Sequence, residues 1–466
     1  MSFSLVLRTA IVAIVVGAAS LAPVGIGVSA SAASLPTPVA ASITGSSAAA
    51  TGLSADEVIM NIRQEYLLTT QVGYKAGKVR TVETVTLHND SFSDIGRLNF
   101  SVIPRAVSGT FTLVGDVMVN GTPASVSWTT NTNLAVDLAT PLAPQGTATI
   151  KIEFALQLHA GSGNFPARFS LTAGVLNLGN WFPILSREHD AYGIGDPQVT
   201  WVAKRITLDL RTDENLASTA IAAPGTLVKS ATRHWTYRLD NARDYAFAIS
   251  SNFTRRTATV SGVRIEAYTT RGSAPALLAI MKAAVSRYTG WYGSMPYNRF
   301  IIAETGASDF AQEYPGMVLA GPNMVGYSPA MWHEVAHQWW YAGVGDDQLV
   351  SPWLDEAFAE FSARRALGMA FPTCSSGNID SAVTDWPAGL TDGAWLGCGR
   401  YFDTVYMRGA AFLNALRSQM GEAKFFKTLK AFATSHRYAM VTSDEMLDAL
   451  IAGGASTSII AKYTSR

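Results

Sequence analysis

The sequence predicts a multidomain protein in which an all-β module of the sandwich or curved-sheet type precedes an α+β module. Two patterns carry this prediction. From about residue 55 to about residue 255, short runs alternate apolar and polar residues between clusters of turn-forming residues, which is typical of antiparallel sheets. After about Ser273, apolar residues recur instead at intervals of three or four, which is the helical period. The length of 466 residues accommodates two or three domains, and a hydrophobic content of 48% supplies sizeable cores.

The first 54 residues are expected to lie outside both modules. Arg8 is the only charged residue among the first 55, and the apolar run Thr9–Val28 follows it. The run leads to Ala30-Ser31-Ala32, a small-residue pattern at which signal peptidases cut, so residues 1–32 are predicted to be a secretory signal peptide. An uncleaved N-terminal membrane anchor is the alternative, because about 20 apolar residues can span a bilayer. Residues 33–54 are predicted to be a flexible linker rich in Ala, Ser, Thr and Pro, so we expect a secreted protein with no stable membrane association after cleavage.

The all-β module is expected over residues 55–255. Its alternating runs are residues 81–87, 109–115, 124–128, 147–154 and 205–211. Because successive side chains of a strand point to opposite faces, each run can bury one face and leave the other in water. These patterns alone indicate a scaffold or binding module and nothing more specific.

Residues 256–466 are expected to form the second module. An amphipathic helix is predicted over Ala274–Met295, where apolar residues follow the helical spacing. Two buried strands are predicted after it, over Asn298–Glu304 and Gly316–Gly321. Helical stretches around residues 422–436 and 443–453 complete the module, so helices and strands are mixed here.

A helix expected to begin at Ser328 carries a metal-binding pattern. Ser328 is suited to the N-cap and Pro329 to the first helical position. His333 and His337 are four residues apart, so both imidazoles lie on one helical face and can reach one metal ion. Glu334 is rotated by about 100° from His333 and borders the metal without ligating it, where a general base for water is needed. The chain has only 7 histidines, so a chance match to this pattern is rare.

Glu356 is the best candidate for a third ligand. It lies near the start of a second helix, which Ser351 and Pro352 open in the same cap-then-proline pattern. Two antiparallel helices can present the two histidines and Glu356 to one Zn²⁺ and leave a fourth position open. The alternative is that Glu356 is a helix-start carboxylate that stabilises the macrodipole. Glu360, one turn further on, is either an acceptor for a ligand histidine's free N–H or an ordinary exposed glutamate.

These residues resemble a known family, the zinc aminopeptidases of the aminopeptidase N and leukotriene hydrolase type, which are gluzincin metallopeptidases. The resemblance rests on His333–His337, a gap of 18 residues, and Glu356 within Trp-Leu-Asp-Glu-Ala-Phe-Ala-Glu-Phe. It extends in the right order to outlying segments at residues 180–183, 242–247, 310–316 and 406–410. It implies a saddle-shaped N-terminal β domain followed by a thermolysin-like catalytic domain that holds one zinc ion.

The resemblance also implies roles for two residues outside the metal site. Glu313 corresponds to the glutamate that holds the α-amino group of a peptide, so that the first peptide bond lies at the zinc. Tyr406 corresponds to the tyrosine that donates its O–H to the oxyanion of the tetrahedral intermediate. The alternatives are a strand-edge carboxylate for Glu313 and a core aromatic for Tyr406. Arg408 stands where the family usually has lysine, and we assign it no role.

Two departures from the family pattern bear on specificity. Phe310, Gln312 and Tyr314 replace the Gly, Met and Asn that usually surround the amine-binding glutamate. Residues 357–466 suffice to complete a thermolysin-like domain but not the large helical C-terminal domain that commonly covers the family's active site. We therefore expect that domain to be lacking and the cleft to be open.

Charge and cysteine content exclude several other classes of protein. The 35 basic and 35 acidic residues give a net charge of zero, which argues against nucleic acid as a partner. Two cysteines cannot build a multi-cysteine metal framework. In a secreted protein, Cys374 and Cys398 are expected to form a disulfide near the site.

The predicted function is that of a secreted zinc metallopeptidase, with peptides as substrates. Aminopeptidase action is the first expectation. A thermolysin-like endopeptidase and a catalytically weak secreted binding protein on the same fold are the alternatives.

Overall fold

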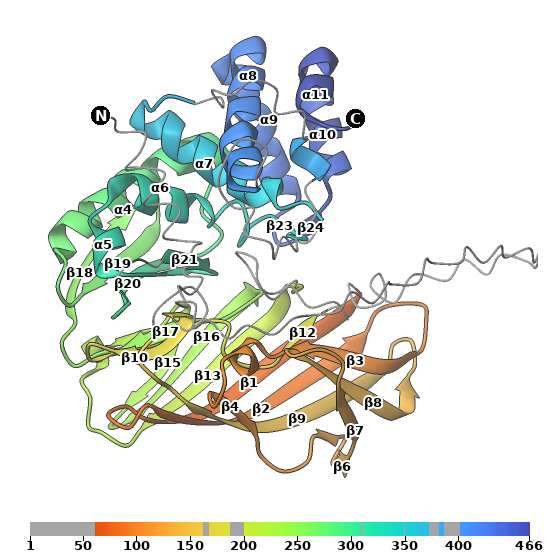
Figure 1. Cartoon of the computed structure of the whole chain (residues 1–466), viewed down its shortest axis with the longest axis vertical. Helices are drawn as coiled ribbons and strands as arrows, with labels where there is room; N and C mark the ends of the chain where they lie inside the picture. Colours follow the sequence, from red (N-terminus) through yellow and green to blue (C-terminus); the bar gives the residue numbers. More distant parts are fainter. Residues whose placement is uncertain are drawn as a thin grey trace, which may run out of the picture.

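The computed structural model describes residues 61–161, 167–186, 200–307, 309, 311–348, 350–371, 382–385 and 401–466. Two modules are stacked in it, with the β-rich module at the bottom of Figure 1 and the helix-rich module above it. The predicted signal peptide and linker, together with Cys374 and Cys398, lie outside the described residues. None of the helices in the described parts of the chain combines the length and apolar character that a membrane span requires.

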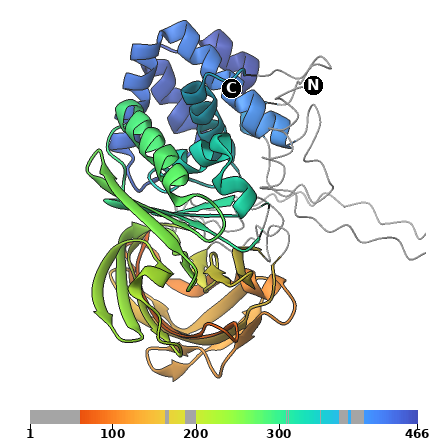
Figure 2. The same cartoon turned by 90° about the vertical axis from the view of Figure 1, so that its left-hand side faces the viewer.

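A nine-stranded sheet forms the body of the lower module. Its order is β15-β16-β13-β1-β2-β9-β5-β6, with β4 paired to β9, and all its pairs are antiparallel except β1 with β13. The strands are β1 (Ile62–Gly73), β2 (Lys78–Asn89), β4 (Phe111–Leu113), β5 (Met118–Val119), β6 (Thr122–Pro123), β9 (Thr147–Gln157), β13 (Ala203–Thr212), β15 (Thr226–Ala231) and β16 (His234–Ala242). Figure 2 shows how strongly this sheet curves.

Two four-stranded sheets complete the lower module. The first has the order β12-β3-β8-β7 and the second β10-β11-β17-β14. Their strands are β3 (Ile95–Ser101), β7 (Ser125–Trp128), β8 (Asn133–Leu142), β10 (Phe169–Thr172), β11 (Val175–Leu178), β12 (Ile184–Ser186), β14 (Ile221–Ala222) and β17 (Phe247–Ile249). Short 3₁₀ turns lie between these sheets and the large sheet, η1 (Ile103–Ala106) between β3 and β4 and η2 (Ser218–Ala220) between β13 and β14.

The alternation read from the sequence corresponds to burial in this module. In β9, Ile150, Ile152 and Phe154 are fully buried, whereas the residues between them reach the surface. The five predicted runs overlap β2, β4, β7, β9 and β13. The prediction of an all-β module followed by an α+β module is confirmed.

A five-stranded mixed sheet begins the upper module. Its order is β18-β19-β20-β22-β21, and β19, β20 and β22 run parallel to one another. The strands are β18 (Thr254–Val260), β19 (Val263–Thr269), β20 (Arg299–Glu304), β21 (Ala311–Tyr314) and β22 (Met317–Ala320). The change from the lower module's sheets to this sheet falls between Ile249 and Thr254.

Helices cover one face of this sheet, as Figure 2 shows. They are α4 (Ala274–Tyr292), α5 (Pro322–Val325), α6 (Ser328–Ala336), α7 (Trp353–Leu367), η3 (Val383–Asp385), the π-helix η4 (Phe402–Arg408), α8 (Gly409–Met420), α9 (Glu422–Ser435), α10 (Ser443–Ala452) and α11 (Thr457–Tyr463), with the short pair β23 (Gly345–Asp346) and β24 (Met440–Val441) below them. The helix predicted to reach Met295 ends at Tyr292, because Gly293 adopts a φ of 90° and breaks it.

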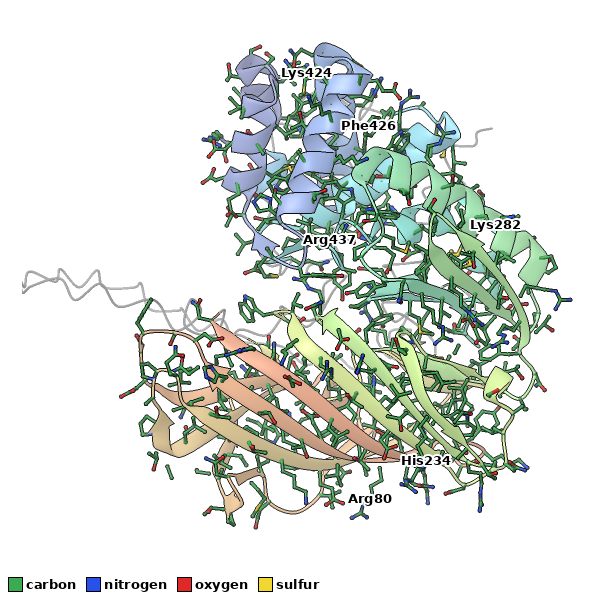
Figure 3. All side chains as sticks on the ribbon, turned by 180° about the vertical axis from the view of Figure 1, so that it is seen from behind. Arg80, His234, Lys282, Lys424, Phe426 and Arg437 are labelled. Carbon is green, nitrogen blue, oxygen red and sulfur yellow. The ribbon has the colours of Figure 1, made fainter. Side chains whose placement is uncertain are left out.

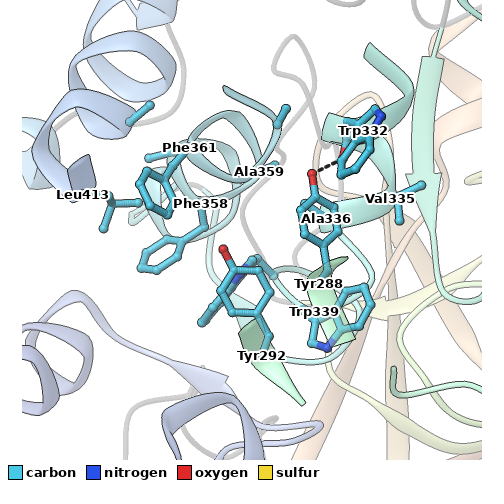
Figure 4. Packing of buried hydrophobic residues seen from close by; sticks show 14 of the residues in the cluster. Tyr288, Tyr292, Trp332, Val335, Ala336, Trp339, Phe358, Ala359, Phe361 and Leu413 are labelled. Carbon is cyan, nitrogen blue, oxygen red and sulfur yellow. Dashed lines mark hydrogen bonds between the residues drawn. The ribbon is translucent and has the colours of Figure 1, made fainter. Parts of the chain in front are cut away.

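Aromatic side chains pack the helices of the upper module together. Tyr288 and Tyr292 of α4 lie against Trp339, just beyond α6, and Phe358 of α7 lies opposite them (Figure 4). The Tyr288 hydroxyl donates a hydrogen bond to the carbonyl of Trp332, 3.0 Å away. This packing fixes α6 and α7 side by side. Charged residues such as Arg80, Lys282 and Lys424 are distributed along the outside of both modules (Figure 3).

Candidate metal centre and active site

Helix α6 positions the histidine pair. Met331 and Val335 are buried in the core of the upper module, so the opposite positions face α7. The helix begins at Ser328 as expected, but Tyr327 and not Ser328 occupies the N-cap, and its side chain makes no capping hydrogen bond. Pro329 still lies in the first turn, where its missing N–H leaves no bond unmade.

Helix α7 also departs from the expected start. Its N-cap is Pro352 rather than Ser351, again without a side-chain cap. The Ser351 hydroxyl instead lies 2.9 Å from the hydroxyl of Ser443 in α10. A tertiary contact has therefore replaced the local capping bond that the sequence favoured.

The structure brings His333, His337 and Glu356 together. One ligand atom from each lies within 4.8 Å of the others, and all three side chains are buried. The Oε2 atom of Glu356 is 3.2 Å from Nε2 of His333 and 3.5 Å from Nε2 of His337. Two imidazole nitrogens and one carboxylate oxygen are the donor set of catalytic zinc sites, so these residues fit one Zn²⁺.

Both histidines are oriented through their second ring nitrogen. The Nδ1 atom of His333 is 3.2 Å from Oε2 of Glu360, and Nδ1 of His337 is 3.1 Å from the carbonyl oxygen of Trp340. Glu360 in turn accepts a hydrogen bond from Arg364, 2.5 Å from its Oε1. Glu360 is buried, so the alternative of an ordinary exposed glutamate is wrong. Such contacts fix the ring orientation and leave both Nε2 atoms directed at the metal position.

The electrostatics at this point favour a bound cation. Burial opposes a charge on His333, but the hydrogen-bonded carboxylates of Glu356 and Glu360 outweigh it and raise the pKa of His333 to about 10. Burial lowers the pKa of His337 to about 3. Burial alone would raise the pKa of Glu356, yet the neighbouring histidines lower it. The two carboxylates thus attract positive charge to the histidine pair, and a divalent ion would supply it.

Tyr406 lies on the π-helix η4, beside the metal ligands. Its hydroxyl donates a hydrogen bond to Oε1 of Glu356, and its ring stacks on His333 with a centroid separation of 5.9 Å. Burial, with the charge of Glu356, holds the pKa of Tyr406 well above its usual value. The side chain is buried against Phe402, but its O–H remains a proton donor aimed at the site.

Glu334 and Glu313 lie in the same region. Glu334 is a buried residue of α6 directly after His333. Glu313 lies on β21, the edge strand of the five-stranded sheet, and accepts a hydrogen bond from Gln312 at 2.7 Å. Ligand-type atoms of Glu313, His337 and Asp355 lie within 4.8 Å of one another, so β21 delivers Glu313 to the side of the site formed by His337.

Sequence reasoning missed two residues of this region. Asp355 is fully buried and approaches Nδ1 of His337 at 3.5 Å. Arg364 is buried beside Glu360. The signal for Asp355 was its position directly before Glu356, and the signal for Arg364 was its spacing of four residues from Glu360.

A helix with two histidines four residues apart, completed by a glutamate from the next helix, defines the site of the HExxH zinc peptidases. The fold agrees with this class. The chain has the two-domain fold of an M1 zinc metallopeptidase from Deinococcus radiodurans, with a TM-score of 0.61 at 18% identity over 86% of this chain and 92% of that one. A mutant of the Deinococcus radiodurans enzyme bound to a Tyr-Ser-Ala substrate gives a TM-score of 0.63 at 16% identity, covering 87% of this chain and 95% of that one.

Sequence comparison finds shorter matches to proteins of the same type. Aminopeptidase M1 of Arabidopsis thaliana is 26% identical over 133 residues, which is 26% of this chain and 15% of that protein. Aminopeptidase M1-D of Oryza sativa subsp. japonica is 25% identical over 126 residues, which is 24% of this chain and 14% of that protein. The matched segments therefore span about a seventh of these relatives. No family model matches the chain.

Proposed function

We propose that this protein is a zinc-dependent peptidase that removes N-terminal residues from peptides. The observation that carries the proposal is the convergence of His333, His337 and Glu356 in a buried cluster, with Glu334 and Tyr406 beside it. A zinc ion held there supplies a Lewis acid that polarises a peptide carbonyl and makes water more acidic.

Each remaining residue has a task that its chemistry suits. Glu334 takes a proton from the attacking water and passes it to the leaving amine. Tyr406 donates its O–H to the negative charge that develops on the carbonyl oxygen. Glu360 and the Trp340 carbonyl hold the two imidazoles in place.

The aminopeptidase specificity rests on Glu313. A buried carboxylate beside the site can pair with the protonated α-amino group of a peptide, which fixes the first peptide bond at the reacting position. Asp355 and Glu313 together place two carboxylates beside His337, which strengthens the attraction for a cationic amine.

Peptides with free and acetylated N-termini test this proposal. The zinc-loaded protein should cleave the free peptide after its first residue and leave the acetylated peptide intact. Glu313→Gln should raise KM for the free peptide by about tenfold or more, since a charge-assisted bond is lost. Cleavage of the acetylated peptide at internal bonds would show an endopeptidase instead.

The metal-site variants provide the matched controls. Glu334→Gln preserves the size of the side chain and the zinc ligands, and should lower kcat by about 10²–10⁴-fold. If wild-type protein and this variant are equally inactive on both peptides, the chain is a binding protein on a peptidase fold.

We further propose that the protein acts outside the cell. Support comes from the apolar run Thr9–Val28 and the small residues Ala30-Ser31-Ala32 after it. Expression of the full chain, followed by N-terminal sequencing of the protein recovered from the medium, should give a new N-terminus near residue 33. Recovery of uncleaved chain in the membrane fraction would show an anchor instead.

A further inference from the structure

A pocket lined by three arginines opens between the two modules. Its volume is about 370 Å³. Tyr237 of β16 lines the wall formed by the lower module, while Arg255 of β18, Arg264 of β19 and Arg299 at the start of β20 line the wall formed by the upper module. A pocket of this size is in the range that holds small-molecule ligands.

The five-stranded sheet separates this pocket from the metal ligands. In β19, Arg264, Glu266 and Tyr268 alternate with Ile265 and Ala267. The two alternating apolar residues belong to the core under the helices, so the three polar ones point to the opposite face. The pocket is therefore a different site from the one that holds His333 and Glu356.

The charges in the pocket do not balance. Glu266 is buried and accepts hydrogen bonds from Nε of Arg299 at 2.7 Å and from Nε of Arg264 at 2.9 Å. Arg255 approaches the same carboxylate at 3.7 Å. Although burial favours the neutral acid, Arg299 outweighs it and lowers the pKa of Glu266, so this carboxyl stays ionised. Three guanidinium groups thus share one negative charge and leave an excess of two positive charges.

The three arginines differ in how many of their N–H donors already bond to other groups of the protein. Arg299 is largely saturated, because its Nη1 also donates to the carbonyls of Ala223 and Gly225 at 2.7 and 3.1 Å. Arg264 uses only its Nε in this way, and within the described residues its Nη atoms have no hydrogen-bond partner. The side chains of Arg264 and Arg255 are 55% and 31% exposed, so both reach the mouth of the pocket.

We propose that this pocket binds a small oxyanion carrying two negative charges, such as the phosphate group of a phosphate monoester, at the exposed guanidinium groups of Arg255 and Arg264. Guanidinium groups bind phosphate and carboxylate oxygens through paired N–H donors, and the excess of two positive charges matches a dianion. The proposal does not depend on peptide hydrolysis.

Calorimetric titration of inorganic phosphate into the full zinc-loaded chain tests it, with chloride used to keep the ionic strength constant. Saturable binding of one phosphate is expected. Arg264→Gln and Arg255→Gln should each weaken it by at least about tenfold, the loss of one charge-assisted contact. Arg256→Gln is the matched control, because Arg256 is an exposed neighbour on the opposite face of β18, and it should leave the affinity unchanged.

Further titrations distinguish phosphate bound in this pocket from phosphate bound elsewhere on the protein. Phosphate held at the metal would persist in Arg264→Gln and vanish in His337→Ala, whereas phosphate in the pocket shows the reverse pattern. Malonate, a dianion, should compete with phosphate, and acetate should not. Equal competition by acetate, unchanged binding in both arginine variants, or no saturable binding to the wild-type protein would overturn the proposal.

Discussion

His333 meets a carboxylate at each of its two ring nitrogens, and this arrangement explains how one histidine can be both oriented and poised for a metal. Glu356 faces Nε2 and Glu360 faces Nδ1, each at 3.2 Å. Among the residues that the structure describes, only the first of these positions is shared with a second histidine, and it is there that three possible metal ligands of this group converge. Glu360 would act on a bound metal through the ring of His333, and Arg364 holds Glu360 in place.

This arrangement makes Glu360 a test of metal affinity. Glu360→Gln removes the charge that fixes His333 and should weaken zinc binding by about 10–100-fold, as loss of such a partner does in other metal sites. Competition with a chelator measures the dissociation constant. Glu65→Gln, which removes a partly exposed surface carboxylate paired with Lys204, is the control and should not change it. Equal zinc affinity in the two variants would contradict the role of Glu360.

Glu83 shows a different consequence of burial, in the lower module. The carboxyl lies in β2 on the buried face of the large sheet, and within the described residues neither of its oxygens has a hydrogen-bond partner. Desolvation by burial raises the pKa of Glu83 well above its usual value. The folded protein therefore holds a proton that the unfolded chain releases at lower pH, so stability is lost as pH rises from the unfolded pKa towards the folded one.

Glu83→Gln should remove this loss. The variant should match the wild-type free energy of unfolding near pH 4 and exceed it at pH 7–8. The gain is about 1.4 kcal/mol for each pH unit between the unfolded pKa and the pH of measurement, up to the folded pKa. Urea denaturation at several pH values measures it. Glu153→Gln on the adjacent strand β9, a partly exposed carboxylate paired with Arg80, should show no such pH dependence.

The site residues could be predicted where their relation is local in sequence. His333, Glu334 and His337 lie on one helix, so the helical period alone relates them. Glu356 was predictable because its helix follows directly and its sequence context is specific. Asp355 was not recognised, since its approach to His337 depends on how α7 packs against α6, and that packing is set by aromatic residues such as Tyr292 and Phe358.

At the scale of elements, the contact between α7 and the segment η4–α8 controls where Tyr406 lies. Gly409 begins α8, and a Cβ atom at this position would come within 2.4 Å of the Cβ of Ala357. Ala357 directly follows the proposed ligand Glu356. The absence of a side chain at Gly409 therefore lets η4 approach α7 closely enough for the Tyr406 hydroxyl to reach Glu356.

Gly409→Ala should separate these elements. Gly409 has an ordinary helical backbone, so the effect comes from crowding alone, and overpacking of this kind costs about 1–3 kcal/mol. We expect a lower melting temperature together with a loss of kcat larger than any change in KM. Gly290→Ala in α4, where a Cβ meets nothing within 4 Å, should instead stabilise the protein by about 0.5–1 kcal/mol. Activity of Gly409→Ala at the wild-type level would show that the close approach is not needed.

Helix starts were predicted less well than helix positions. Both Ser-Pro pairs mark the correct helices, because proline tolerates the first turn, but neither serine supplies a capping bond. In α10 the local signal does prevail, since Thr442 and Glu445 form a reciprocal capping box. The difference between these helix starts lies in the tertiary contacts that each capping residue can make. Ser351 is within reach of Ser443, whereas the side chains of the Thr442–Glu445 pair bond to each other and to each other's backbone.

At the scale of the whole molecule, the two modules share a core. One cluster of fully or nearly fully buried residues combines small side chains of the lower module, such as Ala222 and Ala248, with larger ones of the five-stranded sheet, such as Ile301 and Leu319. A glycine lets the two modules approach each other closely at a second point. A Cβ at Gly306 would lie 1.9 Å from the carbonyl oxygen of Thr172.

A polar network reinforces this shared core. The Tyr314 hydroxyl, on the strand that carries Glu313, lies 3.2 Å from Oδ1 of Asn180 in the lower module. Asn180 in turn donates to Asp244 at 2.7 Å. The lower module therefore supports the strand that delivers Glu313 to the site. Sequence patterns could predict each module but not this interface, because its residues come from segments far apart in the chain.

A shared core predicts that a ligand of one module stabilises both. Zinc that binds only the folded protein stabilises it by about 2.7 kcal/mol at a free concentration of one hundred times the dissociation constant. If the modules unfold as one unit, this gain should slow amide hydrogen exchange in β17, at the interface, by the same factor as in α7, which carries Glu356. Strand β7, at the far edge of the lower module, exchanges through local opening and should not respond.

His337→Ala removes a proposed ligand and should abolish the effect of zinc on exchange in both β17 and α7. Slower exchange in α7 with no change in β17 would show instead that the modules unfold independently, with the shared core separating before either module loses its own structure.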